Sequence, residues 1–500
     1  MIIDGRTIPN GTQKSTQVCI IGSGQAGITA AWQLQKAGIK VILIEGSRMW
    51  NTMEESWPDK VLLYNGVSDG LFKTNEPEFL ILPYVNHQYP AKERERMYGG
   101  TSTHWGGQSR PEDQIDMDAR PGFPGWPITR KDLDPYYAQA SKFCVLHGDY
   151  GVNGDNFSNE YWTKTLSAQV PNLNGFDVEM YQFMGGSYLN FATRDFDGKG
   201  TIGDSPVEVI RNASLLNIDL QQGSVSQLQV ASMDTAIPPN TPKPATKFTI
   251  KADIYVLACG AVANAQNLLL SNAGNENDQV GRYFMCHPLT NGQYLRTTTS
   301  PNFLPYNQAK LLNGELSPGV RWSDSNGVQV TGRFIPNAEQ TTKLGIGRCW
   351  FWYVYGQYYF EQAPNRDSRI TLTDTLDPVF QLRQTRATWV LSDTDQKTYE
   401  QTTALFQTAV KNLGGTFTFP TWDFIKGTLV VNGHHMGTTR MSSDPTQGVV
   451  DPNLKVHSLK NLYCAGASVF PSGGISNPTF TIITLSIRLA DYLRKQLTGA

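Results

Sequence analysis

The chain has 500 residues, of which 39% are hydrophobic, 11% aromatic and 17% charged, as is ordinary for a globular protein. Its formal net charge of −2 gives no electrostatic case for nucleic acid or an anionic membrane as a partner. No stretch reaches the ~20 apolar residues of a membrane helix, and residues 1–17 lack the apolar core of a secretory signal. We therefore expect a cytoplasmic protein of roughly two to three domains. The six cysteines show neither zinc-site nor redox-dithiol spacing, so no metal site is predicted.

The first clear unit spans residues 17–46. An apolar run ends at Gly22, residues 26–37 have helical periodicity, and residues 41–44 form a second apolar run. This pattern predicts a strand, a helix and a second strand, with the sequence G-x-G-x-x-G at the first turn.

The glycines of this turn are Gly22, Gly24 and Gly27. The first permits a tight turn, the second lets backbone amides approach a pyrophosphate, and the third lets the helix pack closely on the strand. Glu45 ends the second strand, where a carboxylate accepts hydrogen bonds from ribose hydroxyls. The unit therefore predicts a dinucleotide site, and on this evidence alone FAD and NAD both remain open.

The rest of the chain is mixed. Residues 50–95 show no sustained period and are interpreted as an excursion or lid, and a glycine-rich segment follows at 98–107. Residues 282–425 are dominated by strand-like alternation. Further predicted elements are β-structure over 207–262, a strand at 461–464, and helices over 132–145, 264–271, 395–413 and 479–497.

Two C-terminal segments are the most informative. One runs Gly-His-His-Met-Gly-Thr-Thr over 433–439, and the other contains Ala-Gly-Ala-Ser at 465–468 and Asn-Pro-Thr at 477–479. Together with the dinucleotide loop and the Gly-Gly-Thr-Ser sequence at 99–102, they occur in the order typical of the glucose–methanol–choline (GMC) oxidoreductases. The chain resembles that family over nearly its whole length, and its middle segment is most similar to the pyranose oxidase, sugar and glycoside oxidase branch.

The resemblance implies an α/β + β fold. A Rossmann-type FAD-binding domain is built from the discontinuous segments 1–281 and 430–500, and a β-sheet-rich substrate domain is inserted at 282–429. FAD is the implied cofactor. The implied FAD contacts are Gly22, Gly24, Gln25, Ala26, Gly27, Glu45, Gly46, Gly100, Ser102, His104, Trp105, Val225, Gly466, Ala467, Pro478 and Thr479.

The resemblance also implies the catalytic pair. His434 stands three residues before Gly437, where the family has its catalytic histidine, and Asn477 matches the second polar catalytic position. A neutral imidazole can accept the hydroxyl proton of an alcohol while hydride passes to flavin N5, and an amide can orient the substrate oxygen. His435 is the rival candidate, because adjacent residues on a strand face opposite sides.

His104, in the sequence Ser-Thr-His-Trp, is the candidate for a covalent bond to the flavin ring. Two alternatives remain open here: His104 attaches the flavin through a ring nitrogen, or it only packs beside it.

An aromatic run predicts the substrate region. It comprises Trp350, Phe351, Trp352, Tyr353, Tyr355, Tyr358, Tyr359 and Phe360. On a strand one parity can line a pocket while the other packs the sheet, and flat aromatic surfaces suit a sugar ring. Ordinary sheet packing is the alternative.

We therefore expect FAD-dependent oxidation of an alcohol group on a sugar, glycoside or polyol, with O₂ or another electron acceptor. The alternatives are a non-redox FAD-containing lyase of the same fold and the catalytic subunit of an electron-transfer dehydrogenase complex. The substrate, the acceptor and the oligomeric state stay open.

Overall fold

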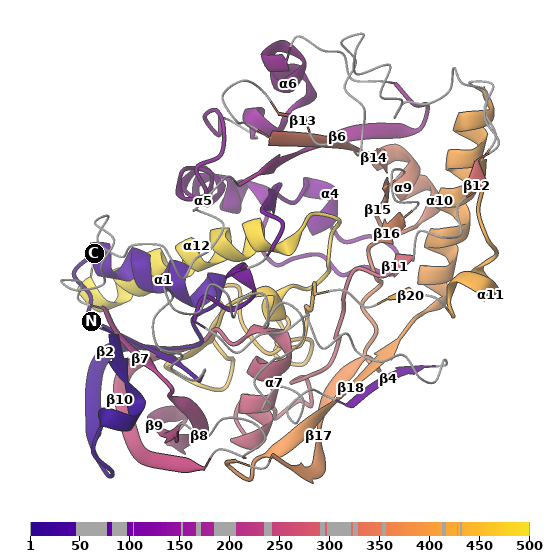
Figure 1. Ribbon diagram of the computed structural model, residues 1–500. Coiled ribbons are helices and arrows are strands. Elements are labelled where there is room, and N and C mark those ends of the chain that lie inside the picture. Colours follow the sequence, from indigo (N-terminus) through magenta and orange to yellow (C-terminus); the bar gives the residue numbers. More distant parts are fainter. Residues whose placement is uncertain are drawn as a thin grey trace.

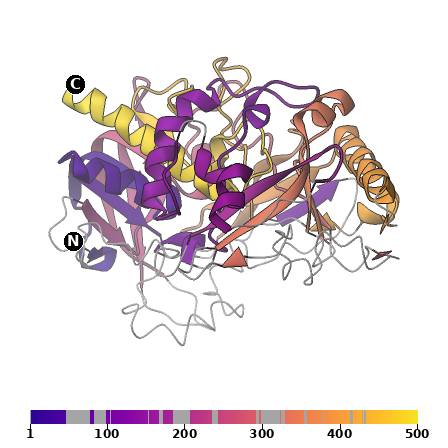
Figure 2. The same cartoon turned by 90° about the horizontal axis from the view of Figure 1, so that it is seen from above.

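The computed structural model describes residues 2–46, 78–82, 98–103, 105–151, 154–166, 172–184, 207–234, 243–290, 296–297, 322–323, 329–352, 357–377, 379–412, 417–427, 429–430 and 433–499. Two views at right angles show a large sheet at one end of the molecule and the long helix α10 (Asp393–Asn412) at the other (Figure 1, Figure 2).

The large sheet takes strands from both the N-terminal and the C-terminal parts of the described chain. Its strand order is β1-β7-β3-β2-β10-β9-β8, and β21 also pairs with β10. β2, β3, β7 and β21 run parallel to their neighbours, whereas β8, β9 and β10 form an antiparallel meander. Its strands are β1 (Ile2–Asp4), β2 (Gln13–Ile21), β3 (Val41–Glu45), β7 (Val207–Arg211), β8 (Ser214–Gln221), β9 (Ser224–Met233), β10 (Pro244–Leu257) and β21 (Leu462–Cys464).

Helices cover this sheet. α1 (Gln25–Lys36) connects β2 to β3, and α12 (Pro478–Thr498) lies along α1 (Figure 1). α5 (Arg130–Phe143) packs on α12 and begins with a capping box between Thr129 and Asp132. α7 (Gly260–Leu270) follows β10 directly.

The β-rich part consists of smaller sheets, with strand orders β13-β14-β6-β5, β15-β16-β11-β20, β17-β18-β4 and β12-β19. Their strands are β4 (Glu78–Leu82), β5 (Gln108–Ser109), β6 (Phe176–Phe183), β11 (Leu289–Thr290), β12 (Arg296–Thr297), β13 (Trp322–Ser323), β14 (Gln329–Pro336), β15 (Cys349–Trp352), β16 (Gln357–Phe360), β17 (Arg369–Leu376), β18 (Arg383–Val390), β19 (Phe417–Thr418) and β20 (Leu429–Val430). The shorter helices are α4 (Gln114–Met117), α6 (Asn159–Leu166), α9 (Ala338–Leu344) and α11 (Trp422–Ile425).

The predicted fold class is confirmed: strands from separated segments form one FAD-type sheet, and a β-rich part is inserted between them. The helix predictions hold to within a few residues, and the largest shift is at α7, which begins at Gly260 rather than Asn264. β5 and β6 lie in the segment assigned to the FAD domain, but β6 pairs with β14 of the β-rich part and β5 pairs with β6. The domain boundaries therefore stay a prediction, and most of the expected lid at 50–95 lies outside the described residues.

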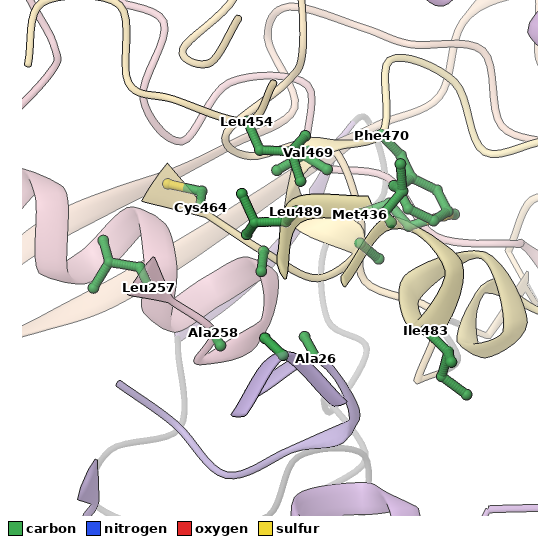
Figure 3. Packing of buried hydrophobic residues seen from close by; sticks show 14 of the residues in the cluster. Ala26, Leu257, Ala258, Met436, Leu454, Cys464, Val469, Phe470, Ile483 and Leu489 are labelled. Atoms are coloured by element: carbon green, nitrogen blue, oxygen red, sulfur yellow. The ribbon is translucent and has the colours of Figure 1, made fainter. Parts of the chain in front are cut away.

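The main core joins the N-terminal and C-terminal segments. One buried cluster contains Ala26 from α1, Ala258 directly after β10, Met436, and Ile483 from α12 (Figure 3). Because apolar burial favours folding in proportion to the area removed from water, this shared core fixes the two motif-bearing segments relative to each other.

Candidate active site

The dinucleotide loop has the conformation that its glycines predict. Gly22 has φ +100°, a backbone conformation that favours glycine. A Cβ on Gly27 would lie 1.9 Å from the carbonyl oxygen of Gly22, so α1 approaches β2 more closely than any side chain allows. At Gly24 a Cβ would meet nothing within 4 Å, which leaves open space beside the N-terminus of α1. A helix N-terminus with open space beside it suits a phosphate group.

Glu45 is tied to this loop. Its Oε2 accepts a hydrogen bond from the backbone amide of Ser23 at 3.1 Å and another from the Ser23 hydroxyl. Gly99, which precedes the predicted contact Gly100, donates its amide to the Ser23 carbonyl oxygen at 3.1 Å. The middle glycine segment therefore lies directly on the dinucleotide loop.

A pocket runs along these segments. Of the predicted FAD contacts, those that line it are Gly22, Gly24, Gln25, Ala26, Glu45, Gly46, Gly100, Gly466 and Ala467. Further residues line the pocket that were not predicted as FAD contacts. They are Thr101, Ala213 to Leu215, Ala258 to Ala263, Gln266, Asn267, Leu270, Asp377, Phe380, Leu382 and His435. The loop between β10 and α7 and the β17–β18 hairpin carry no motif, so only the fold brings them to the pocket.

Other predicted contacts lie outside this lining. Ser102 is buried and donates its hydroxyl to Gly99, and Trp105 packs against the main core. Pro478 and Thr479 form the first turn of α12. Val225 lies in β9, where its amide donates to Oδ1 of Asn461 at 2.8 Å.

His104 lies outside the described residues, so both alternatives for it, a covalent bond to the flavin and packing beside the flavin, stay predictions.

The segment that carries His434 is held by hydrogen bonds to other parts of the chain. Met436 and Met285 form an antiparallel bridge and exchange both backbone hydrogen bonds, at 2.9 and 3.1 Å. The Thr438 hydroxyl donates to the Ala261 carbonyl at 2.6 Å. Asn264 donates to the Ser468 hydroxyl at 2.9 Å, so α7 also fixes the Ala-Gly-Ala-Ser segment.

His434 and Asn477 are brought together as predicted. Nε2 of His434 lies 3.4 Å from Nδ2 of Asn477, which is the N-cap residue of α12. The neighbouring His435 instead lines the dinucleotide pocket and packs against the ring of Phe284. The two adjacent histidines therefore face different surroundings, and it is His434 that faces the second predicted catalytic residue.

Two side chains that the sequence did not indicate extend this pair. Nδ1 of His287 lies 2.8 Å from Nδ1 of His434, and Nη1 of Arg333 donates to Oδ1 of Asn477 at 3.3 Å. His287 could have been suspected only as one of seven histidines in the chain. It stands opposite His434 because of the Met285–Met436 bridge, which joins segments far apart in the sequence.

The electrostatics of this group favour uncharged imidazoles. Burial lowers the pKa of His434 well below its ordinary value, and the neighbouring His287, His435 and Arg333 lower it further. Burial also lowers the pKa of His287, although hydrogen bonds to Gly474 and Gly473 oppose that effect. A neutral His434 can accept a proton at physiological pH.

The aromatic run separates by parity. The Trp350 and Tyr359 rings stack at 4.3 Å, and the Tyr359 ring lies 6.4 Å from that of His434. Tyr358, on the other face of β16, is buried against Tyr399 of α10. Of the described aromatic side chains, Tyr359 and the Trp350 ring stacked on it thus lie beside the candidate catalytic pair, and Tyr358 packs against α10.

The residues of the pocket fit a flavin dinucleotide. A glycine loop and helix N-terminus suit the pyrophosphate, Glu45 suits ribose hydroxyls, and the pocket extends from there to His435 and Gly466. Within the described residues no cluster of side chains could hold a metal ion. None of the helices described is both long and apolar enough to cross a membrane. The fold and the site thus define an FAD-dependent oxidoreductase.

Comparison with known proteins agrees. Residues 364–486 match the family model described as GMC oxidoreductase, and residues 15–55 match the one described as FAD binding domain. The resemblance indicated by the motifs is confirmed: residues 364–486 carry the GMC oxidoreductase match, and the chain is an FAD-dependent oxidoreductase.

Curated relatives cover nearly the whole chain. The chain is 22% identical to 2-methyl-1,2-propanediol dehydrogenase of Mycolicibacterium austroafricanum, over 97% of this chain and 96% of the relative. It is also 22% identical to the fructose dehydrogenase large subunit of Gluconobacter japonicus, over 97% and 98%. The structure of formate oxidase from Aspergillus oryzae RIB40 superposes with a TM-score of 0.62 at 16% identity, covering 98% of this chain and all of that one.

Proposed function

We propose that the chain oxidises an alcohol group of a sugar, glycoside or similar polyol, with His434 as the general base. The observation that carries this proposal is the placement of Nε2 of His434 and Nδ2 of Asn477 within 3.4 Å of each other. One atom can accept a proton and the other can donate a hydrogen bond, which is what the hydroxyl group of an alcohol requires.

The two side chains divide the chemistry. The substrate hydroxyl donates to His434, which takes its proton as the carbon is oxidised. The amide of Asn477 donates to the same oxygen and stabilises the negative charge that develops on it. Bound FAD supplies the acceptor for the hydride. Helix α12 begins at Pro478, directly after Asn477, so the positive end of the helix dipole lies at Asn477. There it would favour negative charge developing on the substrate oxygen.

The aromatic face supports a carbohydrate or polyol substrate. The stacked Trp350 and Tyr359 rings present a flat apolar surface next to His434. Such surfaces pack against the C–H face of a sugar ring, while polar groups select its hydroxyls. The relatives named for a propanediol and for fructose act on small polyhydroxylated molecules, which agrees with this substrate class.

The electron acceptor is a second question. One relative is named as the large subunit of a dehydrogenase, which favours an electron-transfer complex as the second candidate function. Admitting air after anaerobic reduction distinguishes an oxidase from a dehydrogenase with another acceptor. Rapid return of the flavin absorbance indicates an oxidase, and persistent bleaching indicates another acceptor.

An anaerobic flavin-reduction screen over sugars, glycosides and simple alcohols tests the proposal. Bleaching by a sugar or polyol supports it, whereas product formation without bleaching indicates the lyase alternative. His434→Ala should keep FAD bound and slow flavin reduction by roughly 10²- to 10⁴-fold. His457→Ala is the matched control, because the His457 ring bonds the Ser442 carbonyl oxygen instead. Unchanged single-turnover reduction in His434→Ala would remove His434 from the mechanism.

A further inference from the structure

A chain of hydrogen bonds runs through the candidate catalytic pair, and its direction is set at both ends. At one end is His287, whose ring is buried. Its Nε2 lies 2.9 Å from the carbonyl oxygen of Gly474 and 3.3 Å from that of Gly473. A carbonyl oxygen only accepts, so the proton of His287 is on Nε2. Burial lowers the pKa of this ring and so favours its neutral form, in which Nδ1 of His287 is an acceptor.

The position of the proton on His287 determines the position of the proton on His434. Nδ1 of His434 lies 2.8 Å from the accepting Nδ1 of His287, so it must be the donor. A neutral imidazole carries one proton, and in His434 that proton is now on Nδ1. The lone pair of His434 is therefore on Nε2, the nitrogen that faces Asn477.

The other end is fixed by a group that can only donate. Nη1 of Arg333 lies 3.3 Å from the amide of Asn477, and a guanidinium has no acceptor. The oxygen of the amide must face Arg333, so its NH₂ group is turned toward Nε2 of His434. The lone pair on Nε2 of His434 and the NH₂ group of Asn477 thus face each other as acceptor and donor.

Both ends are held in place by buried contacts. The Gly474 amide donates to Oε1 of Glu361 at 3.0 Å, and Glu361 forms a salt bridge with Arg120. The guanidinium of Arg333 lies 3.9 Å from the ring centres of both Tyr181 and Trp350. Neither end can therefore turn without breaking buried contacts.

We propose that His287 and Arg333 are positioning residues that direct this chain, so that Nε2 of His434 is the proton acceptor and Asn477 presents its NH₂ group to the substrate oxygen. This inference rests on the proposed function for its consequence in catalysis. The hydrogen-bond directions themselves are independent of which substrate binds.

The first test reads the tautomers directly. In holoenzyme labelled with ¹⁵N-histidine, protonated and unprotonated ring nitrogens give separate chemical shifts, and seven histidines contribute. His434→Ala and His287→Leu assign the two rings. We expect the proton on Nδ1 in His434 and on Nε2 in His287. A proton on Nε2 of His434 in the native holoenzyme would overturn the proposal, even if His434→Ala abolished activity.

The second test is kinetic and has matched variants. His287→Leu removes the hydrogen bonds to His434, Gly473 and Gly474, whereas His287→Gln keeps a donor and an acceptor on one planar group. We expect His287→Leu to lower the limiting rate of flavin reduction roughly 10- to 100-fold, with half-saturation changed much less, and His287→Gln to recover most of that loss. Equal rates in the two variants, with the His434 tautomer unchanged in His287→Leu, would contradict a positioning role.

Arg333 is tested in the same way. Arg333→Met removes the donor that orients Asn477, and Arg333→Lys keeps a donor and the charge. We expect the limiting rate to fall more in Arg333→Met than in Arg333→Lys, with FAD still bound in both. If His434→Ala left reduction unchanged while the tautomers were as expected, the general-base role would fail and the hydrogen-bond assignment would stand.

Discussion

Gly27 lies against Gly22 so closely that a Cβ on Gly27 would stand 1.9 Å from the Gly22 carbonyl oxygen. Gly27→Ala must therefore push α1 away from β2. Overpacking of this kind costs about 1–3 kcal/mol. We expect the free energy of unfolding to fall by that amount even without FAD, as measured by urea unfolding of the apoprotein.

Gly24→Ala is the matched control for this effect. Its Cβ would meet no protein atom within 4 Å, and its backbone φ of −70° suits alanine. We expect unchanged unfolding of the apoprotein but weaker FAD binding, because the methyl group enters the space for the pyrophosphate. Equal loss of stability in both variants would show that helix packing is not the reason for Gly27.

Substitution of Glu45 should change the affinity for FAD. Its carboxylate is buried and accepts from both the amide and the hydroxyl of Ser23, and it lines the pocket. Hydrogen bonds to a charged acceptor contribute about 1.5–3 kcal/mol. Glu45→Gln should weaken FAD binding by roughly 10- to 100-fold in a fluorescence titration. Gln17→Glu is the control, because Gln17 lies in β2 but does not line the pocket. This variant should leave the affinity for FAD unchanged.

The rate of flavin reduction should fall at low pH, where His434 becomes protonated. The base must be neutral, and burial together with His287, His435 and Arg333 lowers the pKa of His434 well below its ordinary value. The rate should stay constant as the pH falls through about 6.5 and drop only below it. Stopped-flow reduction across this range measures it. In Arg333→Met the drop should begin at higher pH, since a facing positive charge is gone.

The same shift predicts a loss of stability in acid. The unfolded chain binds a proton at His434 near pH ~6.5, and the folded chain does so only at lower pH. The contribution of His434 to the free energy of unfolding is therefore fully present above pH ~6.5. It is lost as the pH falls toward the pKa of His434 in the folded chain. His434→Ala should make the free energy of unfolding less dependent on pH in this window. An unchanged dependence would show that other groups dominate it.

Tyr358 and Tyr359 should respond differently to mutation. The Tyr358 hydroxyl is buried and bonds that of Thr402 at 2.5 Å. Tyr358→Phe should lower the free energy of unfolding by about 0.5–1.5 kcal/mol and leave turnover unchanged. Tyr359→Leu removes a ring beside His434, so it should raise the substrate concentration for half-maximal reduction with little loss of stability. Steady-state kinetics and thermal unfolding of both variants measure the difference.

The sequence predicted the parts of the site that local patterns encode. The turn at Gly22 and the acid Glu45 follow from a motif whose spacing reflects a fixed backbone geometry. The pairing of His434 with Asn477 is what the family resemblance implied. The fold class followed from the same motifs, because the family resemblance carries the discontinuous sheet with it.

The rest depends on long-range pairing. His287 reaches His434 through the Met285–Met436 bridge, and Arg333 reaches Asn477 from β14. Neither residue lies in a recognisable pattern, and periodicity does not specify which distant strands meet. For His104 the mass of the denatured protein decides: a mass raised by that of FAD supports the covalent bond, and the apoprotein mass alone excludes it.

The position of β21 in the large sheet has a consequence for biosynthesis. This strand comes from residues 462–464 and pairs with β10, and the N-cap residue Asn477 follows it. Domains begin to fold as the N-terminal part leaves the ribosome. Here the strands of the N-terminal half emerge long before their last partner. The candidate site can therefore be completed only after residue 477 has been synthesised, and a ribosome that stalls before it releases a chain without the His434–Asn477 pair.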